Sequence, residues 1–258
     1  MKYKISSKKK LGIIGGMGSH AGVWLFNRIT ELSYAEKDQE YLDIIVHSNS
    51  DIPDRTRAIV YKETSPLPEL QRSIRLFNSS NVDVAVLACM TAHYYCDQLE
   101  RQFNGKILSA VDLVLEELTT NPAYSGKKKI GLIGSTGLLK SHIYHNHLEP
   151  LGYEVITLND TEQEEYFMRP IYMEGGIKSG VLTEDVKQLF CCQVPILAEK
   201  GAEVVVGACS EVPLVIKGGL SIPFIDAFEL LAQKTVDYCY NQSYESVSTK
   251  NLYHALSV

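Results

Sequence analysis

The segment Lys8–Gly15, KKKLGIIG, decides the fold, because nearly the same octapeptide returns 119 residues later as Lys127–Gly134, KKKIGLIG. Two further pairs of segments repeat in the same order, at spacings of 120 and 114 residues: Val82–Cys89 (VDVAVLAC) with Ala202–Cys209 (AEVVVGAC), and Ala110–Asp112 with Phe224–Asp226. Three matches in one order indicate two structurally similar halves.

Each half alternates short apolar runs with amphipathic stretches. The runs are rich in Ile and Val and short enough for strands buried on both faces: Leu11–Ile14, Ile44–His47, Val82–Leu87, Ile130–Ile133, Val155–Leu158 and Val204–Val206. The stretches between them carry apolar residues at helical spacing: Gly22–Tyr34, Pro66–Asn78, Leu138–Leu148 and Glu184–Lys200. The pattern predicts an α/β protein of two doubly wound parallel-sheet domains, related by a pseudo-twofold axis.

Two segments rich in helix- and strand-breaking residues, 119–126 and 218–223, are the candidate crossings between the halves. We therefore predict an N-terminal domain of residues 1–120 plus 221–258 and a second domain of residues 121–220. Ligands of doubly wound folds bind outside the carboxyl ends of the strands, so we expect the active site between the two domains.

The composition and net charge indicate which kinds of molecule the protein is expected to bind. The chain of 258 residues has 25 basic and 31 acidic side chains, a net charge of −6 that does not favour nucleic acid or anionic lipid. No apolar run approaches the roughly 18–20 residues that span a bilayer, so we expect a soluble, cytoplasmic protein. Six irregularly spaced cysteines predict free thiols, and no zinc-ligand spacing appears, so no metal site is expected.

Two of those cysteines, Cys89 and Cys209, end matching apolar runs in the two halves. A cysteine is more often a small buried hydrophobe than a reactive group. Matching thiols of facing halves, however, would reach one cleft from opposite sides, where helix N-termini favour the thiolate. Two acid–base groups on opposite faces of a bound molecule suit the inversion of a stereocentre. The sequence thus predicts racemisation.

The motifs resemble those of the aspartate/glutamate racemase family, in particular its aspartate racemase-like branch, which works without pyridoxal phosphate. The resemblance covers most of the chain. Its carriers are Gly15-Gly16-Met17-Gly18, Ile52-Pro53-Asp54-Arg55-Thr56, Cys89-Met90-Thr91-Ala92-His93 and Cys209-Ser210-Glu211-Val212-Pro213-Leu214.

The resemblance implies roles for individual residues. Cys89 and Cys209 would be the paired proton donors and acceptors, and Arg55 and Lys178 would hold substrate carboxylates. The remaining implied site residues are Asn49 and Thr91 as neutral donors, Met17 against the substrate, and Ser210 and Glu211 beside the second thiol. Met90 is added as a substrate-binding position, although its side chain departs from the family pattern. Two cations suit an acidic amino acid, so we expect a racemase of aspartate first and glutamate next. The family further implies no cofactor and a homodimer.

The main departure from the family pattern is Met90, which stands where relatives have Asn. A thioether cannot replace an amide that donates to a carboxylate. Met90 therefore leaves three outcomes open: weaker binding of aspartate, a more apolar substrate, or a carboxylate-binding or sensory protein that has lost turnover.

Two other enzyme classes remain as alternatives. A related decarboxylase or cis-trans isomerase of small carboxylates would use the same cleft. The segment Gly16-x-Gly18-x-x-Ala21 fits a loose dinucleotide fingerprint, with Glu36 or Asp38 at a suitable distance, so an NAD-dependent enzyme is the second alternative. The repeated half lacks that fingerprint, and hydride transfer gives the paired cysteines no role.

Overall fold

A computed structural model describes residues 8–180, 182–218 and 220–241. They form two parallel four-stranded sheets. The first has the strand order β2-β1-β3-β4 and comprises β1 (Leu11–Gly15), β2 (Ile44–Ser48), β3 (Val84–Leu87) and β4 (Lys106–Ile107). The second has the equivalent order β6-β5-β7-β8 and comprises β5 (Lys129–Ile133), β6 (Glu154–Ile156), β7 (Val204–Gly207) and β8 (Phe224–Asp226).

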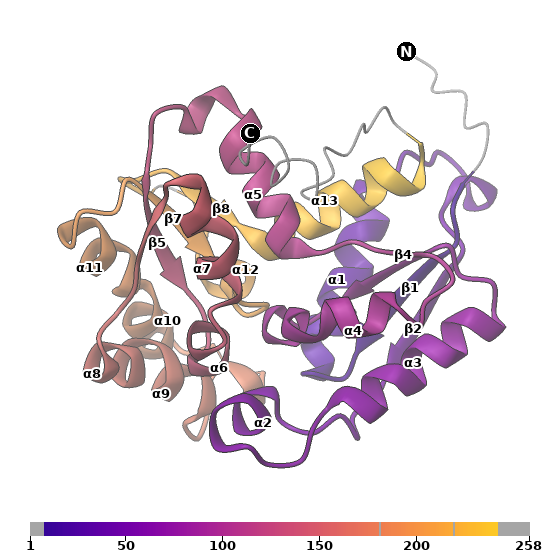
Figure 1. Ribbon diagram of the computed structural model, residues 1–258, viewed down its shortest axis with the longest axis horizontal. Coiled ribbons are helices and arrows are strands. Elements are labelled where there is room, and N and C mark those ends of the chain that lie inside the picture. Colours follow the sequence, from indigo (N-terminus) through magenta and orange to yellow (C-terminus); the bar gives the residue numbers. More distant parts are fainter. Residues whose placement is uncertain (1–7, 181, 219, 242–258) are drawn as a thin grey trace.

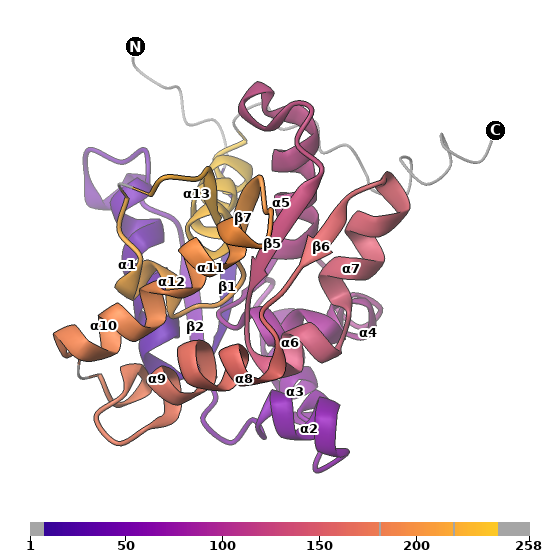
Figure 2. The same ribbon diagram turned by 90° about the vertical axis from the view of Figure 1, so that its left-hand side faces the viewer.

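Thirteen helices lie among the described residues and cover both faces of each sheet (Figures 1 and 2). Those that follow the strands of the first sheet are α1 (Ser19–Leu32), α2 (Arg55–Tyr61), α3 (Leu67–Ser79), α4 (Cys96–Glu100) and α5 (Ala110–Thr120). The others are α6 (Thr136–Lys140), α7 (Ile143–Leu148), α8 (Asp160–Gln163), α9 (Arg169–Tyr172), α10 (Glu184–Cys191), α11 (Gln193–Glu199), α12 (Val212–Val215) and α13 (Ala227–Cys239).

The repeat is confirmed in the packing as well as in the strand order. In the first repeat, Leu11 and Ile13 pack toward α1 and α5, while Ile14 belongs to the apolar layer that α3 covers on the opposite face. Matching glycines lie beneath the outer helices. A Cβ on Gly12 would lie 2.6 Å from the Phe77 ring of α3, and a Cβ on Gly131 would lie 3.2 Å from Leu197 of α11. The recurring Gly of the octapeptides thus lets a helix approach the middle of each sheet.

The last helix of each repeat crosses to the other half. Helix α5 packs against α7, and α13, yellow in Figure 1, runs from the second sheet to α1. One continuous apolar cluster therefore reaches from β1 and β3 to β5 and β7. The division into residues 1–120 plus 221–258 and residues 121–220 stays a prediction. Strand β8, which we assigned to the first domain, pairs in parallel with β7 of the second sheet.

Two details of the predicted elements were wrong. The stretch Leu138–Leu148 is two helices, α6 and α7, because the chain turns at His142 with a left-handed φ of 54°. The stretch Glu184–Lys200 likewise divides at Cys192 into α10 and α11. The short edge strands β4 and β8 were not predicted as strands.

Within the described ranges, no helix has the length and apolar character required to cross a membrane.

Candidate active site

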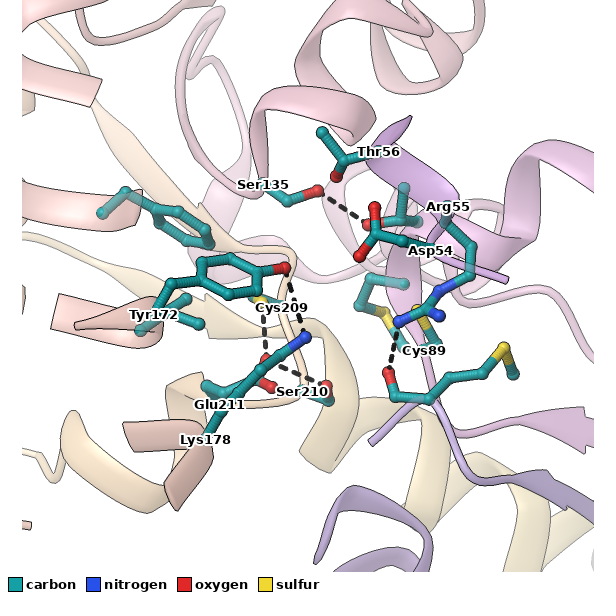
Figure 3. A pocket seen from close by; sticks show the side chains of 15 residues that line it. Asp54, Arg55, Thr56, Cys89, Ser135, Tyr172, Lys178, Cys209, Ser210 and Glu211 are labelled. Carbon is teal, nitrogen blue, oxygen red and sulfur yellow. Dashed lines mark hydrogen bonds between the residues drawn. The ribbon is translucent and has the colours of Figure 1, made fainter. Parts of the chain in front are cut away.

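A pocket lies between the two sheets, at the carboxyl ends of their central strands (Figure 3). Its volume is about 370 Å³, including the space at its mouth. The lining side chains come from both halves: Met17, Asp54, Arg55, Thr56, Cys89, Met90 and Thr91 from the first, and Ser135, Phe167, Ile171, Tyr172, Lys178, Cys209, Ser210 and Glu211 from the second.

Equivalent strands deliver the two thiols. Cys89 comes two residues after the end of β3, and Cys209 comes two residues after the end of β7. Both are free and nearly buried, with 6% and 9% of their surfaces exposed. Because parallel strands of facing sheets end at this pocket, the two sulfurs approach it from opposite halves. The expected convergence of Cys89 and Cys209 is therefore present.

The surroundings of Cys209 hold it in the protonated form. Its Sγ lies 2.8 Å from Oε2 of Glu211, a distance at which the thiol donates to the carboxylate. The hydroxyl of Ser210 donates to the same oxygen at 3.0 Å. Burial first, and then the negative charge of Glu211, raise the pKa of Cys209 well above its ordinary value. Cys209 is thus a thiol at neutral pH.

Cys89 has a cationic neighbour instead. The guanidinium of Arg55 is 8% exposed, and three backbone carbonyls orient it: Nη2 donates to Met17 O at 3.0 Å, and Nη1 donates to Pro53 O at 3.1 Å and Ile52 O at 3.5 Å. Burial lowers the pKa of Arg55, but Cys89 and then Asp54 raise it by more, so it lies above its usual value. The guanidinium is thus a fixed positive charge beside this sulfur.

The second cation enters from the segment after α9. Gly176 closes a tight turn, where a Cβ would lie 2.6 Å from Pro170 O, and the short 3-10 helix Ile177–Ser179 follows. This turn points Lys178 into the pocket, where its Nζ donates to the Tyr172 hydroxyl at 3.1 Å (Figure 3). Burial lowers the pKa of Lys178, while Tyr172 and Glu211 raise it further, so the side chain stays charged.

Neutral groups connect the two halves across the pocket. The hydroxyls of Thr91 and Ser135 are hydrogen-bonded at 2.7 Å. Met17 and Met90 are each 2% exposed, and Met90 belongs to the apolar cluster shared by both sheets. His93 is buried outside the lining, where its Nδ1 bonds the Cys89 carbonyl at 3.0 Å. Burial lowers the pKa of His93 to about 4, so this ring is neutral.

The structure brings together every predicted site residue except Asn49. The Asn49 amide donates to the Glu69 carboxylate at 3.1 Å, and its Oδ1 accepts from Arg72 at 2.6 Å, so this side chain faces α3 and does not line the pocket. Sequence reasoning missed six lining residues: Asp54, Thr56, Ser135, Phe167, Ile171 and Tyr172. Asp54 and Thr56 flank Arg55 in the Ile52–Thr56 motif, so the sequence could have indicated them. The other four lie in the second half of the chain, where fewer motifs resemble those of the family.

Acidic and thiol side chains of the kind that line this pocket also hold metal ions in proteins. Across residues 8–180, 182–218 and 220–241, no three His, Cys, Asp or Glu side chains gather as a ligand set. The pocket instead offers two thiols, two cations and two carboxylates, an arrangement suited to holding a charged small molecule and moving its protons.

Comparisons with known proteins identify the family and the fold. A family model described as Asp/Glu/hydantoin racemase matches residues 14–235. The broad specificity amino-acid racemase RacX of Bacillus subtilis is 24% identical over 231 residues, which are 88% of this chain and 96% of that protein. The aspartate racemase of Picrophilus torridus is 25% identical, with a TM-score of 0.74 over 89% of this chain and 94% of its own. An aspartate racemase homologue from Pyrococcus horikoshii has the same fold, with 24% identity and a TM-score of 0.69 over 90% of this chain and 99% of its own.

Proposed function

Because the chain belongs to the Asp/Glu/hydantoin racemase family, we propose that it interconverts the L and D forms of an acidic amino acid, aspartate first and glutamate next, without pyridoxal phosphate. The activities for which RacX and the Picrophilus enzyme are named support amino-acid racemisation as the reaction class. The homodimer and the cytoplasmic location expected from the sequence stay predictions.

One observation carries the proposal: two buried thiols, one from each half, line a single pocket beside groups of opposite charge. Cys209 donates to Glu211, while Cys89 lies beside Arg55. A two-base reaction needs this asymmetry, since one thiol must start as the acid and the other as the base. In the proposed cycle Cys89 acts first as the base, and Cys209, held as a thiol beside Glu211, acts as the acid.

The reaction then proceeds by two proton transfers. Arg55 binds the α-carboxylate, and the Cys89 thiolate removes the α-proton from one face of the substrate. The electron pair left on the α-carbon spreads into the carboxylate, where the guanidinium stabilises the growing negative charge. Cys209 gives its proton to the opposite face, which forms the other enantiomer. The pair is left as a Cys89 thiol and a Cys209 thiolate, ready for the reverse reaction or for proton exchange with solvent.

The acidic substrate follows from the second cation. Lys178 lies in the half opposite Arg55 and directs its ammonium into the pocket. A second carboxylate on the substrate would pair with it. Met90 supplies no donor to that carboxylate, so the proposal assigns binding of the substrate's two acid groups to Arg55 and Lys178 alone.

The test is incubation of the reduced protein with each enantiomer of aspartate and then of glutamate, with no added cofactor, followed by chiral chromatography. We expect conversion in both directions, and its loss in Cys89→Ala and in Cys209→Ala. The matched control is Cys192→Ala, which removes a free cysteine that does not line the pocket and should leave turnover unchanged. Full turnover by either pocket variant, or none by the folded wild type, would contradict the proposal.

A further inference from the structure

The pocket holds a carboxylate that the proton transfers do not use, that of Asp54. This side chain begins α2, where its Oδ1 accepts the N–H of Arg57 at 2.8 Å. Among the described residues, this is the one hydrogen bond recorded for the Asp54 carboxylate, and Asp54 lines the pocket. Capping the helix therefore leaves Oδ2 available to a ligand.

The charge of Asp54 acts across the cavity. It contributes to the raised pKa of Arg55 on its own side, and to that of Tyr172 on the far side, where burial is the largest cause. Figure 3 shows the Asp54 carboxylate directed toward the Tyr172 hydroxyl, with the space of the pocket between them. A group bound in that space would meet Asp54, Arg55 and Lys178 at different positions.

We propose that Asp54 binds the α-ammonium of the substrate, while Arg55 binds the α-carboxylate and Lys178 the distal carboxylate. The inference rests on the racemase function proposed above and deepens it by naming the side chain that recognises the amino group of the substrate. Three charged substituents then meet three side chains of opposite charge, and the α-carbon lies between the two thiols.

Of the two carboxylates that line the pocket, Asp54 and Glu211, Asp54 is the better candidate to bind an ammonium. Oε2 of Glu211 already accepts from Cys209 and Ser210, and Lys178 adds a positive charge nearby. An ammonium at Glu211 would offset the negative charge that helps to keep Cys209 protonated. An ammonium that leaves water needs a charged hydrogen-bond partner, and Asp54 supplies one without disturbing either thiol.

The assignment of Asp54 also predicts that the pocket distinguishes an amino acid from the dicarboxylates without an amino group that related isomerases would use. A dicarboxylate without an amino group would place negative charge near Asp54 and offer it no donor. The pocket should therefore select against succinate, which has the carbon skeleton of aspartate but no ammonium.

The experiment compares calorimetric binding of L-aspartate and succinate to the full chain and to Asp54→Asn. Asparagine is as good a helix N-cap as aspartate, so α2 keeps its first turn and only the charge is lost. We expect the wild type to prefer aspartate by about tenfold or more, as a charge-assisted bond allows. In Asp54→Asn, affinity for aspartate should fall by about that factor, and affinity for succinate should stay or rise.

The control is Asp51→Asn, in the same loop but outside the pocket, which should change neither affinity. If Asp54→Asn lowers the affinity for aspartate and for succinate equally, Asp54 has only a structural role. If the preference for aspartate is unchanged, Asp54 does not bind the ammonium. Either result overturns the inference. So would a wild type that binds succinate as tightly as aspartate. The proposed function fails separately, when a wild type that shows the expected binding converts neither enantiomer.

Discussion

The carboxylate of Glu211 lies 2.8 Å from the sulfur of Cys209, two residues earlier in the chain. The sequence could place these residues next to one another but not show that one holds the other's proton. The bond is formed because Cys209 follows β7 into a turn that precedes α12, which folds the carboxylate back onto the thiol. This contact distinguishes the second thiol from the first.

The first prediction concerns alkylation of that thiol. In Glu211→Gln the negative charge beside Cys209 is lost, so its pKa should fall and its thiolate fraction rise, about tenfold for each pKa unit. Iodoacetamide labelling near pH 7, followed by peptide mass spectrometry, should show Cys209 reacting more slowly than Cys89 in the wild type. The labelling of Cys209 should become about tenfold faster in Glu211→Gln.

Ser210→Ala is the matched control for that experiment. It removes a neutral bond to the same Glu211 oxygen but keeps the charge, so it should change the labelling of Cys209 far less. Equal labelling of Cys209 in the wild type and Glu211→Gln would show that the carboxylate does not govern this thiol.

The second prediction concerns the contact between α2 and α6 beside the pocket. A Cβ on Gly137 would lie 2.6 Å from Oγ1 and 2.7 Å from Cα of Thr56, so Gly137→Ala must push the two halves apart. We expect a loss of about 1–3 kcal/mol in the free energy of unfolding and a raised KM. Urea denaturation and steady-state kinetics measure both. Gly218→Ala, where a Cβ meets nothing within 4 Å, should change neither. An unchanged KM in Gly137→Ala would contradict a role for this contact in shaping the pocket.

Met90 gives a third prediction. Because it is 2% exposed and packs in the shared apolar cluster at the edge of the pocket, the asparagine implied by the resemblance would bury an amide against apolar side chains. Met90→Asn should lower the free energy of unfolding by about 1–3 kcal/mol if the amide lacks partners. Met90→Leu should cost less than about 1.5 kcal/mol. Denaturant titration distinguishes them, and an Asn variant as stable as the Leu variant would show that the amide is satisfied there.

Asp226 gives a fourth prediction, on pH. Burial is the main cause that raises its pKa from 3.8 to about 6, while its cap bonds to Phe228 and Glu229 act in the opposite direction. The folded state therefore binds this proton more tightly than the unfolded state. The resulting stability is present below about pH 4 and is lost as the pH rises through 6.

The neutral variant Asp226→Asn keeps the cap and removes that titration. Between pH 4 and pH 7 the wild type should lose up to about 3 kcal/mol of unfolding free energy relative to Asp226→Asn. Urea titrations at the two pH values measure the difference. A constant gap between the two proteins would show that Asp226 is ionised throughout this range.

Sequence reasoning succeeded where periodicity and repetition specify the backbone. The repeated octapeptides identified β1 and β5, and the matched positions of Cys89 and Cys209 identified the pocket. It failed where tertiary contacts decide. The two-residue strand β4 is too short to show a pattern, and the left-handed turn at His142 interrupts a stretch whose spacing is helical.

The site residues divide in the same way. Arg55 and Glu211 line the pocket and belong to short motifs that resemble those of the family, so the sequence was sufficient to predict them. Asn49 stands close to Arg55 in sequence, yet its amide faces Glu69 and Arg72 of α3. Tyr172 was missed because its place depends on how the end of α9 lies at the pocket, a tertiary feature without a short sequence signal.

The most direct test of the two-base reaction is deuterium incorporation early in turnover. L-Aspartate is incubated with the protein in D₂O, and the two enantiomers are separated and analysed by NMR before much product has formed. If one thiol removes the proton and the other supplies one from solvent, α-deuterium should appear in the D product while the remaining L substrate keeps its α-proton. Deuterium appearing equally in both enantiomers from the start, or product formed with the original proton, would contradict the assignment of Cys89 and Cys209 as separate bases.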